Sequence, residues 1–263
     1  MIDTLGRPIA HLADHLGEVR VYAHGALRTL TLGNQVEQTC LDLDHPARLV
    51  HAYTQAMLLG LLLTPTPETA LLLGLGGGAL AQALLVGAPG LAVDAVEASP
   101  AVVEAARDHL GLPATDRLRI HIGDAQSFVQ GAGGAYGLVL LDLYGAEGMD
   151  PDQGGAALLS ACRERLSGTG ILVSNHWSND FETSRRAHAT LDQVFTGRVL
   201  HLHVAGGNAI AFAFAKALPG IRRDTLFAKA QALGLRLDLP LQRLARDLWG
   251  QNAEAFKRAR LLL

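Results

Sequence analysis

Short apolar runs and helical patterns alternate along the middle of the chain. The apolar runs predict five strands, at 70–75, 91–97, 118–122, 136–142 and 169–175. Apolar residues at helical spacing predict the helices between and after them, at 78–86, 100–109, 124–130, 153–166 and 181–194. This alternation is typical of a parallel sheet with helices on both faces. We therefore expect an α/β fold.

Two further apolar runs follow, near 197–204 and 208–215, with Gly206-Gly207 between them. A connection this short joins two strands only in an antiparallel arrangement. The predicted order is therefore five strand–helix units closed by a β-hairpin.

The first part of the chain has a different pattern. Alternating runs at 19–23 and 27–32, separated by His24-Gly25-Ala26, predict a β-hairpin within a β-rich segment. Residues 48–63 then predict one largely buried helix, which the Thr64-Pro65-Thr66-Pro67 stretch ends.

The chain from Lys216 onward is predicted to be helical, because Leu241, Leu244 and Leu248 recur at helical spacing. Three parts result: a small N-terminal β-rich domain at 1–45, a central α/β domain at 46–215 and a C-terminal helical extension at 216–263.

A glycine cluster follows the first predicted strand. The run Leu71-Leu72-Leu73 leads into Gly74, Gly76 and Gly78, and an apolar helical pattern begins there. Glycines let a ligand approach the backbone, and the helix start offers free N–H groups and a positive dipole end. A glycine-rich surface turn is the alternative interpretation.

Carboxylates stand at the ends of three further predicted strands. Ligands of doubly wound sheets bind outside the carboxyl ends of the strands. Glu97 can accept both hydroxyls of a ribose there, and Asp124 can accept from an adenine amino group. Asp142 precedes a polar loop, 144–150, that can act as a lid. Each has a structural alternative: Asp124 can cap a helix, Glu97 can be solvated and Asp142 can cap a turn. Together with the glycine loop they predict nucleoside binding.

Composition excludes several classes of protein. An apolar content of 49% and a charged content of 18% fit a globular chain. The longest apolar runs, such as 57–63, are far shorter than the roughly 18 residues of a membrane span. The start of the chain lacks the pattern of a signal peptide. Cys40 and Cys162 have no metal or redox spacing, so we expect buried thiols in a reducing cytoplasm.

Charge is unevenly distributed around the net value of −3. From Lys216 onward the chain has ten Lys/Arg against four Asp/Glu. Such a segment can meet an anionic partner, but no aromatic residues are interleaved with the charges, as binding to nucleic acid would favour. A solvated helix face is the preferred interpretation, and we do not expect a nucleic-acid partner.

Histidines offer weaker candidates. His201 and His203 share a strand face and could bind a metal, but the sequence shows no third ligand, so no metal is predicted. His176-Trp177 follows the fifth predicted strand and can line a pocket or pack in the core.

Over roughly residues 19–215 the chain resembles the spermidine synthase (polyamine aminopropyltransferase) family. The family's GGGDG loop is similar to Gly74–Gly78, and its EID-type motif to Glu97-Ala98-Ser99. Its GDA-type motif matches Gly123-Asp124-Ala125, and its DSSDP-type motif falls on 142–146. The resemblance implies a class I methyltransferase-like Rossmann fold with a small N-terminal β-domain, and commonly a homo-oligomer, such as a dimer.

The resemblance also implies site roles. The donor would be decarboxylated S-adenosylmethionine, with Gly74, Gly76, Gly78, Ala98 and Ala125 in its binding motifs. Glu97 would hold its ribose and Asp124 its adenine. Asp142 would be the base that receives the proton of the acceptor amine, with Tyr144 in the same catalytic motif.

Three carboxylates of the family are replaced here. The aspartate of GGGDG falls on Gly77, and the second aspartate of DSSDP falls on Gly145. The family's tyrosine-histidine-glutamate stretch is similar to Tyr53-Thr54-Gln55. Fewer carboxylates make a less favourable site for a polyamine.

Aminopropyl transfer to a small amine is therefore the leading prediction. Methyl transfer from S-adenosylmethionine is the alternative, because loss of the acid at Gly77 can leave room for the donor's carboxylate. A dehydrogenase, which the closing hairpin disfavours, and a non-catalytic nucleoside-binding homologue are the other hypotheses.

Overall fold

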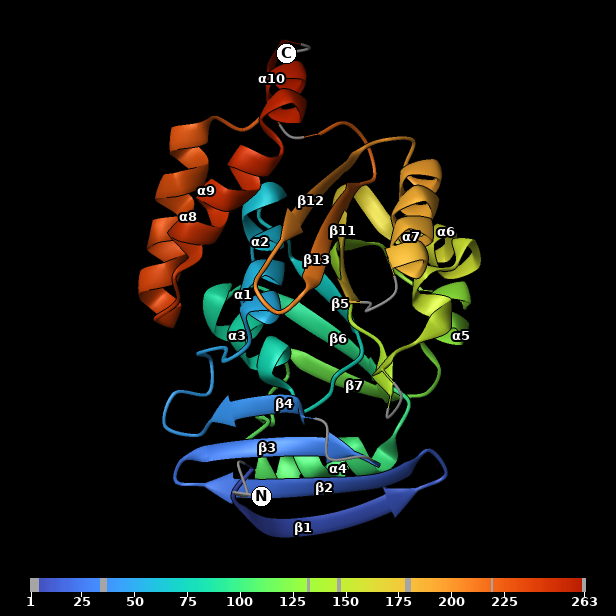
Figure 1. Cartoon of the computed structure of the whole chain (residues 1–263), viewed down its shortest axis with the longest axis vertical. Helices are drawn as coiled ribbons and strands as arrows, with labels where there is room; N and C mark the ends of the chain where they lie inside the picture. The colour runs from blue at the N-terminus through green and yellow to red at the C-terminus, as the bar shows by residue number, and fades with distance from the viewer. Residues whose placement is uncertain are drawn as a thin grey trace.

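Two β-sheets organise the protein, as the computed structural model shows (Figure 1). The structure describes residues 5–33, 37–131, 133–145, 148–177, 181–218 and 220–261.

The larger sheet has seven strands in the order β12-β13-β11-β8-β5-β6-β7. Their bounds are β5 (Thr69–Leu73), β6 (Ala92–Glu97), β7 (Leu118–Ile122), β8 (Tyr136–Leu141), β11 (Leu166–Trp177), β12 (Val199–His203) and β13 (Asn208–Phe214). The first five strands in the chain, β5 to β8 and β11, run parallel, whereas β13 pairs antiparallel with both β11 and β12. The predicted sheet with its closing hairpin is confirmed.

Helices cover both faces of this sheet. The helices that follow its parallel strands are α3 (Ala79–Gly87), α4 (Pro100–His109), α5 (Ala125–Gln130), α6 (Ala156–Glu164) and α7 (Phe181–Val194). Figure 1 shows α5, α6 and α7 on one side of the sheet and α1, α2, α8 and α9 on the other. Leu71 and Leu73 belong to the core on the first side, and Leu72 to the core on the second. A strand buried on both faces explains why its sequence is an unbroken apolar run.

The smaller sheet is antiparallel, with strands β1 (Arg7–Asp14), β2 (Gly17–His24), β3 (Leu27–Leu32) and β4 (Glu37–Asp42) in sequence order. The predicted hairpin is β2–β3, and β1 and β4 were not predicted. Most of β1 is exposed or half-buried, so its apolar pattern is weak. Val21 and Leu30 pack against Val102 of α4, which joins this sheet to the larger one.

The prediction of one helix over 48–63 is wrong. Two short helices occur there, α1 (Ala52–Met57) and α2 (Gly60–Leu63). His51 has extended backbone, so no helix begins at residue 48. Gly60 lies against the sheet, where an added Cβ would be 2.7 Å from Val173 Cγ2. This close approach places the apolar segment flat on the core.

The predicted helix at 153–166 is also shorter. A 3₁₀ turn at Pro151–Gly154 precedes it, and α6 begins only at Ala156. Strands β9 (Tyr144–Gly145) and β10 (Gly148–Met149) form a small hairpin just before this turn, within the predicted lid loop. Ala146 and Glu147 of that loop lie outside the described residues.

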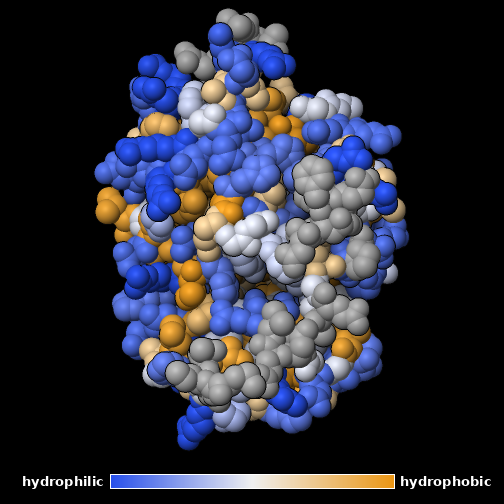
Figure 2. All heavy atoms as spheres, in the orientation of Figure 1, coloured by the Kyte–Doolittle hydropathy of each residue, from blue (hydrophilic) through white to orange (hydrophobic). Residues whose placement is uncertain are grey.

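Three helices end the chain: α8 (Arg223–Leu237), α9 (Leu241–Gln251) and α10 (Ala253–Leu261). Asn252 donates to His201 O at 2.7 Å and accepts from His201 N at 3.1 Å, and Gln251 accepts from His203 N at 2.9 Å. These amides occupy the hydrogen-bonding groups at the outer edge of β12. Figure 2 shows mostly hydrophilic residues over the upper part of the molecule, where these helices lie.

Both cysteines are buried free thiols, as predicted. Across the described ranges, no helix combines the length and the apolar character needed to cross a bilayer.

Candidate functional site

The glycine loop joins β5 to α3 in a conformation that needs glycine. Gly74, Gly76 and Gly78 have φ values of +91°, +53° and +82°, in the region that residues with a Cβ rarely adopt. A Cβ at Gly74 would also be 2.2 Å from Asp142 O. The loop therefore brings the ends of β5 and β8 together.

Glu97, at the end of β6, reaches under this loop. Its Oε2 accepts from Leu75 N at 3.1 Å and from Gly76 N at 3.2 Å, and its Oε1 accepts from Ser99 N at 3.0 Å. Burial raises the pKa of Glu97, and these backbone hydrogen bonds oppose the rise. The carboxylate is thus fixed beside the loop before any ligand binds.

Asp124 caps a helix, which is the structural alternative that the sequence left open, and it also lines the cavity. Its Oδ1 accepts from Ser127 N at 2.7 Å, which caps α5. Hydrogen bonds from the side chain and from the backbone N–H of Ser127 hold the pKa of Asp124 below its usual value. Asp124 and Ala125 also line the same cavity as Glu97 and Ala98.

Asp142 directly follows β8. Its Oδ1 accepts from Asn175 Nδ2 at 2.9 Å, and Tyr53 of α1 donates to the same carboxylate. Burial raises the pKa of Asp142 to about 6, while these two donors oppose the rise. The groups that bond it are neutral, so the carboxylate can exchange a proton near neutral pH.

Two tyrosines enclose Asp142. Burial raises the pKa of both Tyr53 and Tyr144, and the negative charge of Asp142 adds to the rise. Both phenols therefore stay protonated at neutral pH. The ring of Tyr53 stacks on His51 at a centroid distance of 5.8 Å, and His51 pairs with Glu37 at 3.2 Å.

One cavity of about 320 Å³ unites these residues. It lies between the glycine loop, the strand ends of the large sheet and strands β2 to β4 of the small sheet. Its described lining contains no Lys or Arg, but it includes six acidic residues: Asp14, Glu18, Glu97, Asp124, Asp142 and Asp150. This lining favours a cationic ligand.

Gly77 offers no space for a side chain. Its N–H donates to Thr39 Oγ1 at 3.0 Å. An added Cβ would be 2.6 Å from Leu110 Cδ2 and 2.7 Å from Thr39 Cγ2. Thr39 of β4 and Leu110 fill the space beside Gly77, so a side chain at this position would need one of them to shift.

The other two replaced positions differ from Gly77. Gly145 has open space around an added Cβ. Gln55 donates to Leu49 O at 2.8 Å, so its amide supports the turn before α1. Neither replaces the missing carboxylate.

The histidine candidates lie elsewhere. His176 is 2% exposed and, like Trp177, does not line the cavity. The ring of His188 lies 5.5 Å from that of His176 and 4.7 Å from that of His201. Burial lowers the pKa of His176 to about 3 and that of His201 to about 4. In the described part of the chain, no three His, Cys, Asp or Glu residues form a group that could hold a metal ion.

Several residues that contact the site from the cavity or from behind it were not predicted. Asn175 is 1% exposed in β11 and connects Asp142 to Asn208, and Thr39 comes from a strand that the sequence did not reveal. The signal for Asn175 is a polar residue near the end of the apolar run 171–175. For Thr39 and Asn208 we find no such signal.

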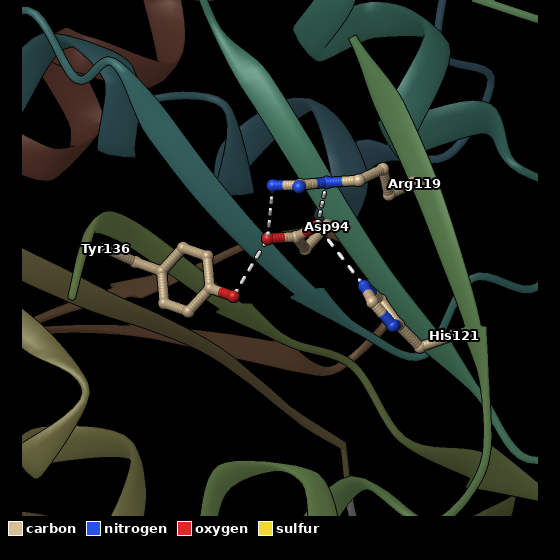
Figure 3. Close-up of polar contacts among 4 residues, drawn as sticks. All are labelled: Asp94, Arg119, His121 and Tyr136. Atoms are coloured by element: carbon tan, nitrogen blue, oxygen red, sulfur yellow. Dashed lines mark hydrogen bonds and ion pairs between the residues drawn. The ribbon is translucent and has the colours of Figure 1, made fainter. Parts of the chain in front are cut away.

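A second polar cluster lies away from the cavity (Figure 3). Asp94 of β6 is 9% exposed. It accepts from Arg119 Nε at 2.9 Å and from Tyr136 OH at 2.9 Å, and His121 Nε2 lies 3.2 Å from its Oδ1. This cluster ties β6 to β7 and to the start of β8.

No protein-family model matches the chain. Among curated proteins, it is 32% identical to the polyamine aminopropyltransferase of Neisseria meningitidis, over 89% of this chain and 90% of that protein. It is also 27% identical to the human eEF1A lysine and N-terminal methyltransferase, over 79% of this chain but 31% of that protein.

Similar solved structures include a methyltransferase-like protein and a spermidine synthase. Human methyltransferase-like protein 13, crystallised with SAH, matches with a TM-score of 0.63 and 25% identity over 72% of this chain and 94% of that chain. A spermidine synthase in complex with the transition-state analogue AdoDATO matches with a TM-score of 0.69 and 17% identity, over 98% of this chain and 88% of that chain. At 17% identity, the match to the spermidine synthase concerns the fold alone.

Proposed function

We propose that this chain, which belongs to the polyamine aminopropyltransferase family, transfers an aminopropyl group from decarboxylated S-adenosylmethionine to a small amine. The family implies the class of reaction. The cavity supports the roles of individual residues.

The adenosyl half of the donor would bind along the glycine loop. Glu97 would accept the ribose hydroxyls, because its carboxylate is already fixed beside Leu75 and Gly76. Asp124 would accept from the adenine amino group with the lone pairs that its helix cap leaves free.

Asp142 would act as the base. The amine nitrogen attacks the propyl carbon next to the sulfonium, a C–N bond forms, the C–S bond breaks and the thioether leaves with the electron pair. The proton lost by the amine passes to Asp142. A sulfonium is a good leaving group, so alignment and proton removal are the main tasks of the protein.

One observation carries this proposal: a carboxylate whose pKa is about 6 and whose bonded partners are neutral stands in the same acidic cavity as the glycine loop. The test is to supply decarboxylated S-adenosylmethionine with diamines of increasing length and measure the methylthioadenosine released. We expect release that depends on the amine and is lost in Asp142→Asn. Asp116→Asn, in an exposed loop, is the matched control. Release without any amine consumed would contradict the proposal.

Methyl transfer is the second candidate, because the glycine loop has no carboxylate at Gly77 to repel the carboxylate that S-adenosylmethionine has and its decarboxylated form lacks. The 25% identity to human methyltransferase-like protein 13 supports it. Calorimetry separates the candidates: tighter binding of S-adenosylmethionine than of its decarboxylated form favours methyl transfer. Binding of both without turnover favours a non-catalytic homologue.

Gly145 offers a further test of the acceptor. A Cβ added at Gly145 meets no described atom within 4 Å, so a side chain can be placed there. If the acceptor is a diamine, Gly145→Asp should lower its KM, whereas a monoamine should gain less.

The domain boundaries, the homodimer and the cytoplasmic location stay predictions. Light scattering tests the dimer.

A further inference from the structure

Three polar side chains form a line across adjacent strands of the large sheet. Asp142 follows β8, Asn175 lies in β11 and Asn208 begins β13, and these strands are neighbours. Asn175 Nδ2 lies 2.9 Å from Asp142 Oδ1, and Asn208 Nδ2 lies 2.9 Å from Asn175 Oδ1. Asn208 does not line the cavity.

The orientation of the Asn175 amide determines which form of Asp142 it stabilises. With Nδ2 toward Asp142, the amide donates to the carboxylate and favours the ionised form. With Oδ1 in that place, it would repel the carboxylate and accept from the protonated acid. An amide alone fits either way, so another group must select one orientation.

We propose that Asn208 is a positioning residue, which holds Asn175 with its Nδ2 toward Asp142 by donating to Asn175 Oδ1. Asn175 is 1% exposed, so water is a poor substitute for that donor. Gln153 fixes the backbone of the same residue by donating to Asn175 O. Asn175 Nδ2 also donates to Tyr144 OH at 3.3 Å, but a hydroxyl can accept or donate and so fits either orientation of the amide, which leaves Asn208 to select one. The inference rests on the proposed role of Asp142.

The other titratable groups described next to Asp142 are Tyr53 from α1 and Tyr144 from β9. The pKa of each phenol is raised, so both remain neutral while Asp142 titrates. Proton loss from these phenols therefore does not contribute to the titration of Asp142 below pH 8.

Two substitutions of Asn208 separate orientation from charge. Asn208→Leu keeps the approximate size but removes the donor. Asn208→Asp offers only acceptors and draws Asn175 Nδ2 away from Asp142. The pKa of Asp142 is read from its carboxyl ¹³C shift in the full-length protein. The matched control, Asn252→Asp, adds a carboxylate at the outer edge of β12, where Asn252 bonds His201.

We expect the pKa of Asp142 to rise by about half a unit in Asn208→Leu and by about one unit or more in Asn208→Asp. It should stay in place in Asn252→Asp, and Asn208→Gln, which restores a donor, should return part of the shift. A pKa that is unmoved in both Asn208→Leu and Asn208→Asp overturns the inference.

Should one variant fail to fold, the other decides the matter alone. The carboxyl shift needs no turnover. Full activity of Asp142→Asn would therefore contradict the proposed base without touching this inference. Loss of that activity with unmoved Asn208 variants would contradict this inference alone.

Discussion

Asp94, within β6, and Asp142, just after β8, both accept from a tyrosine hydroxyl, but their other partners differ. Asp94 bonds a guanidinium, a histidine ring and a phenol (Figure 3). Asp142 bonds a neutral amide and a neutral phenol, and its pKa rises to about 6. Burial raises the pKa of Asp142 and the two neutral donors oppose that rise without cancelling it, so this carboxylate can take a proton near neutral pH. The partners of Asp94 instead use its carboxylate to tie strands together.

Asp142→Asn should have the largest effect. We expect turnover to fall by about 10²- to 10⁴-fold, because the general base is lost. Stability at pH 8 should rise, since the pKa of Asp142 is higher in the folded than in the unfolded chain. The stability it contributes is present at low pH and is lost as pH rises through 6. Turnover assays and thermal melts measure both, and a lower Tm would argue against an enclosed, poorly solvated carboxylate.

The pH dependence of the wild-type reaction should show Asp142 directly. Only the neutral amine reacts, so log kcat/KM plotted against pH should rise with a slope of about one below the pKa of the amine. Protonation of Asp142 should increase that slope to about two below a pH of about 6. Initial rates between pH 4.5 and pH 8 in steps of about half a unit test this. A single slope throughout the range would remove Asp142 as the group that titrates.

Asp94→Asn should give the reverse of Asp142→Asn. We expect a loss of about 2 kcal/mol of unfolding free energy, because a charge-assisted network at a 9% exposed carboxylate is broken. Nucleoside binding and turnover of the folded fraction should be unchanged. Urea unfolding with activity at low denaturant tests this. Lost activity in a fully folded variant would place Asp94 in the catalytic machinery.

Tyr136→Phe should have the smallest effect, about 1 kcal/mol of unfolding free energy. It removes one hydrogen bond to Asp94 and leaves Arg119 in place. The matched variant on the other aspartate is Tyr53→Phe, which should change the pH profile more than the stability. If Tyr136→Phe and Tyr53→Phe changed the stability and the pH profile to the same extent, the two carboxylates would not differ in role.

Local patterns predicted the large sheet and the acids at its edge. An apolar run followed by glycine or an acidic residue can be recognised within one short stretch of sequence. Gly74, Glu97, Asp124 and Asp142 were therefore predicted from the sequence. The structure brings all four to one cavity.

Contacts made through strand pairing were not readable. Asn208 reaches Asn175 because β13 pairs with β11, and Thr39 fills the space beside Gly77 because the small sheet folds over the loop. Helical spacing over 48–63 failed for a related reason, since Gly60 is pressed against Val173 and Leu138. In each case a distant neighbour overrides the local pattern.

The amides of Gln251 and Asn252 also bear on how the chain is made. They cover the outer edge of β12, about 50 residues before them in the chain. Because the chain is synthesised from its N-terminus, this strand edge stays exposed until the helices after β13 have left the ribosome. During that interval the nascent sheet offers an open template for strand addition, and the last helices close it.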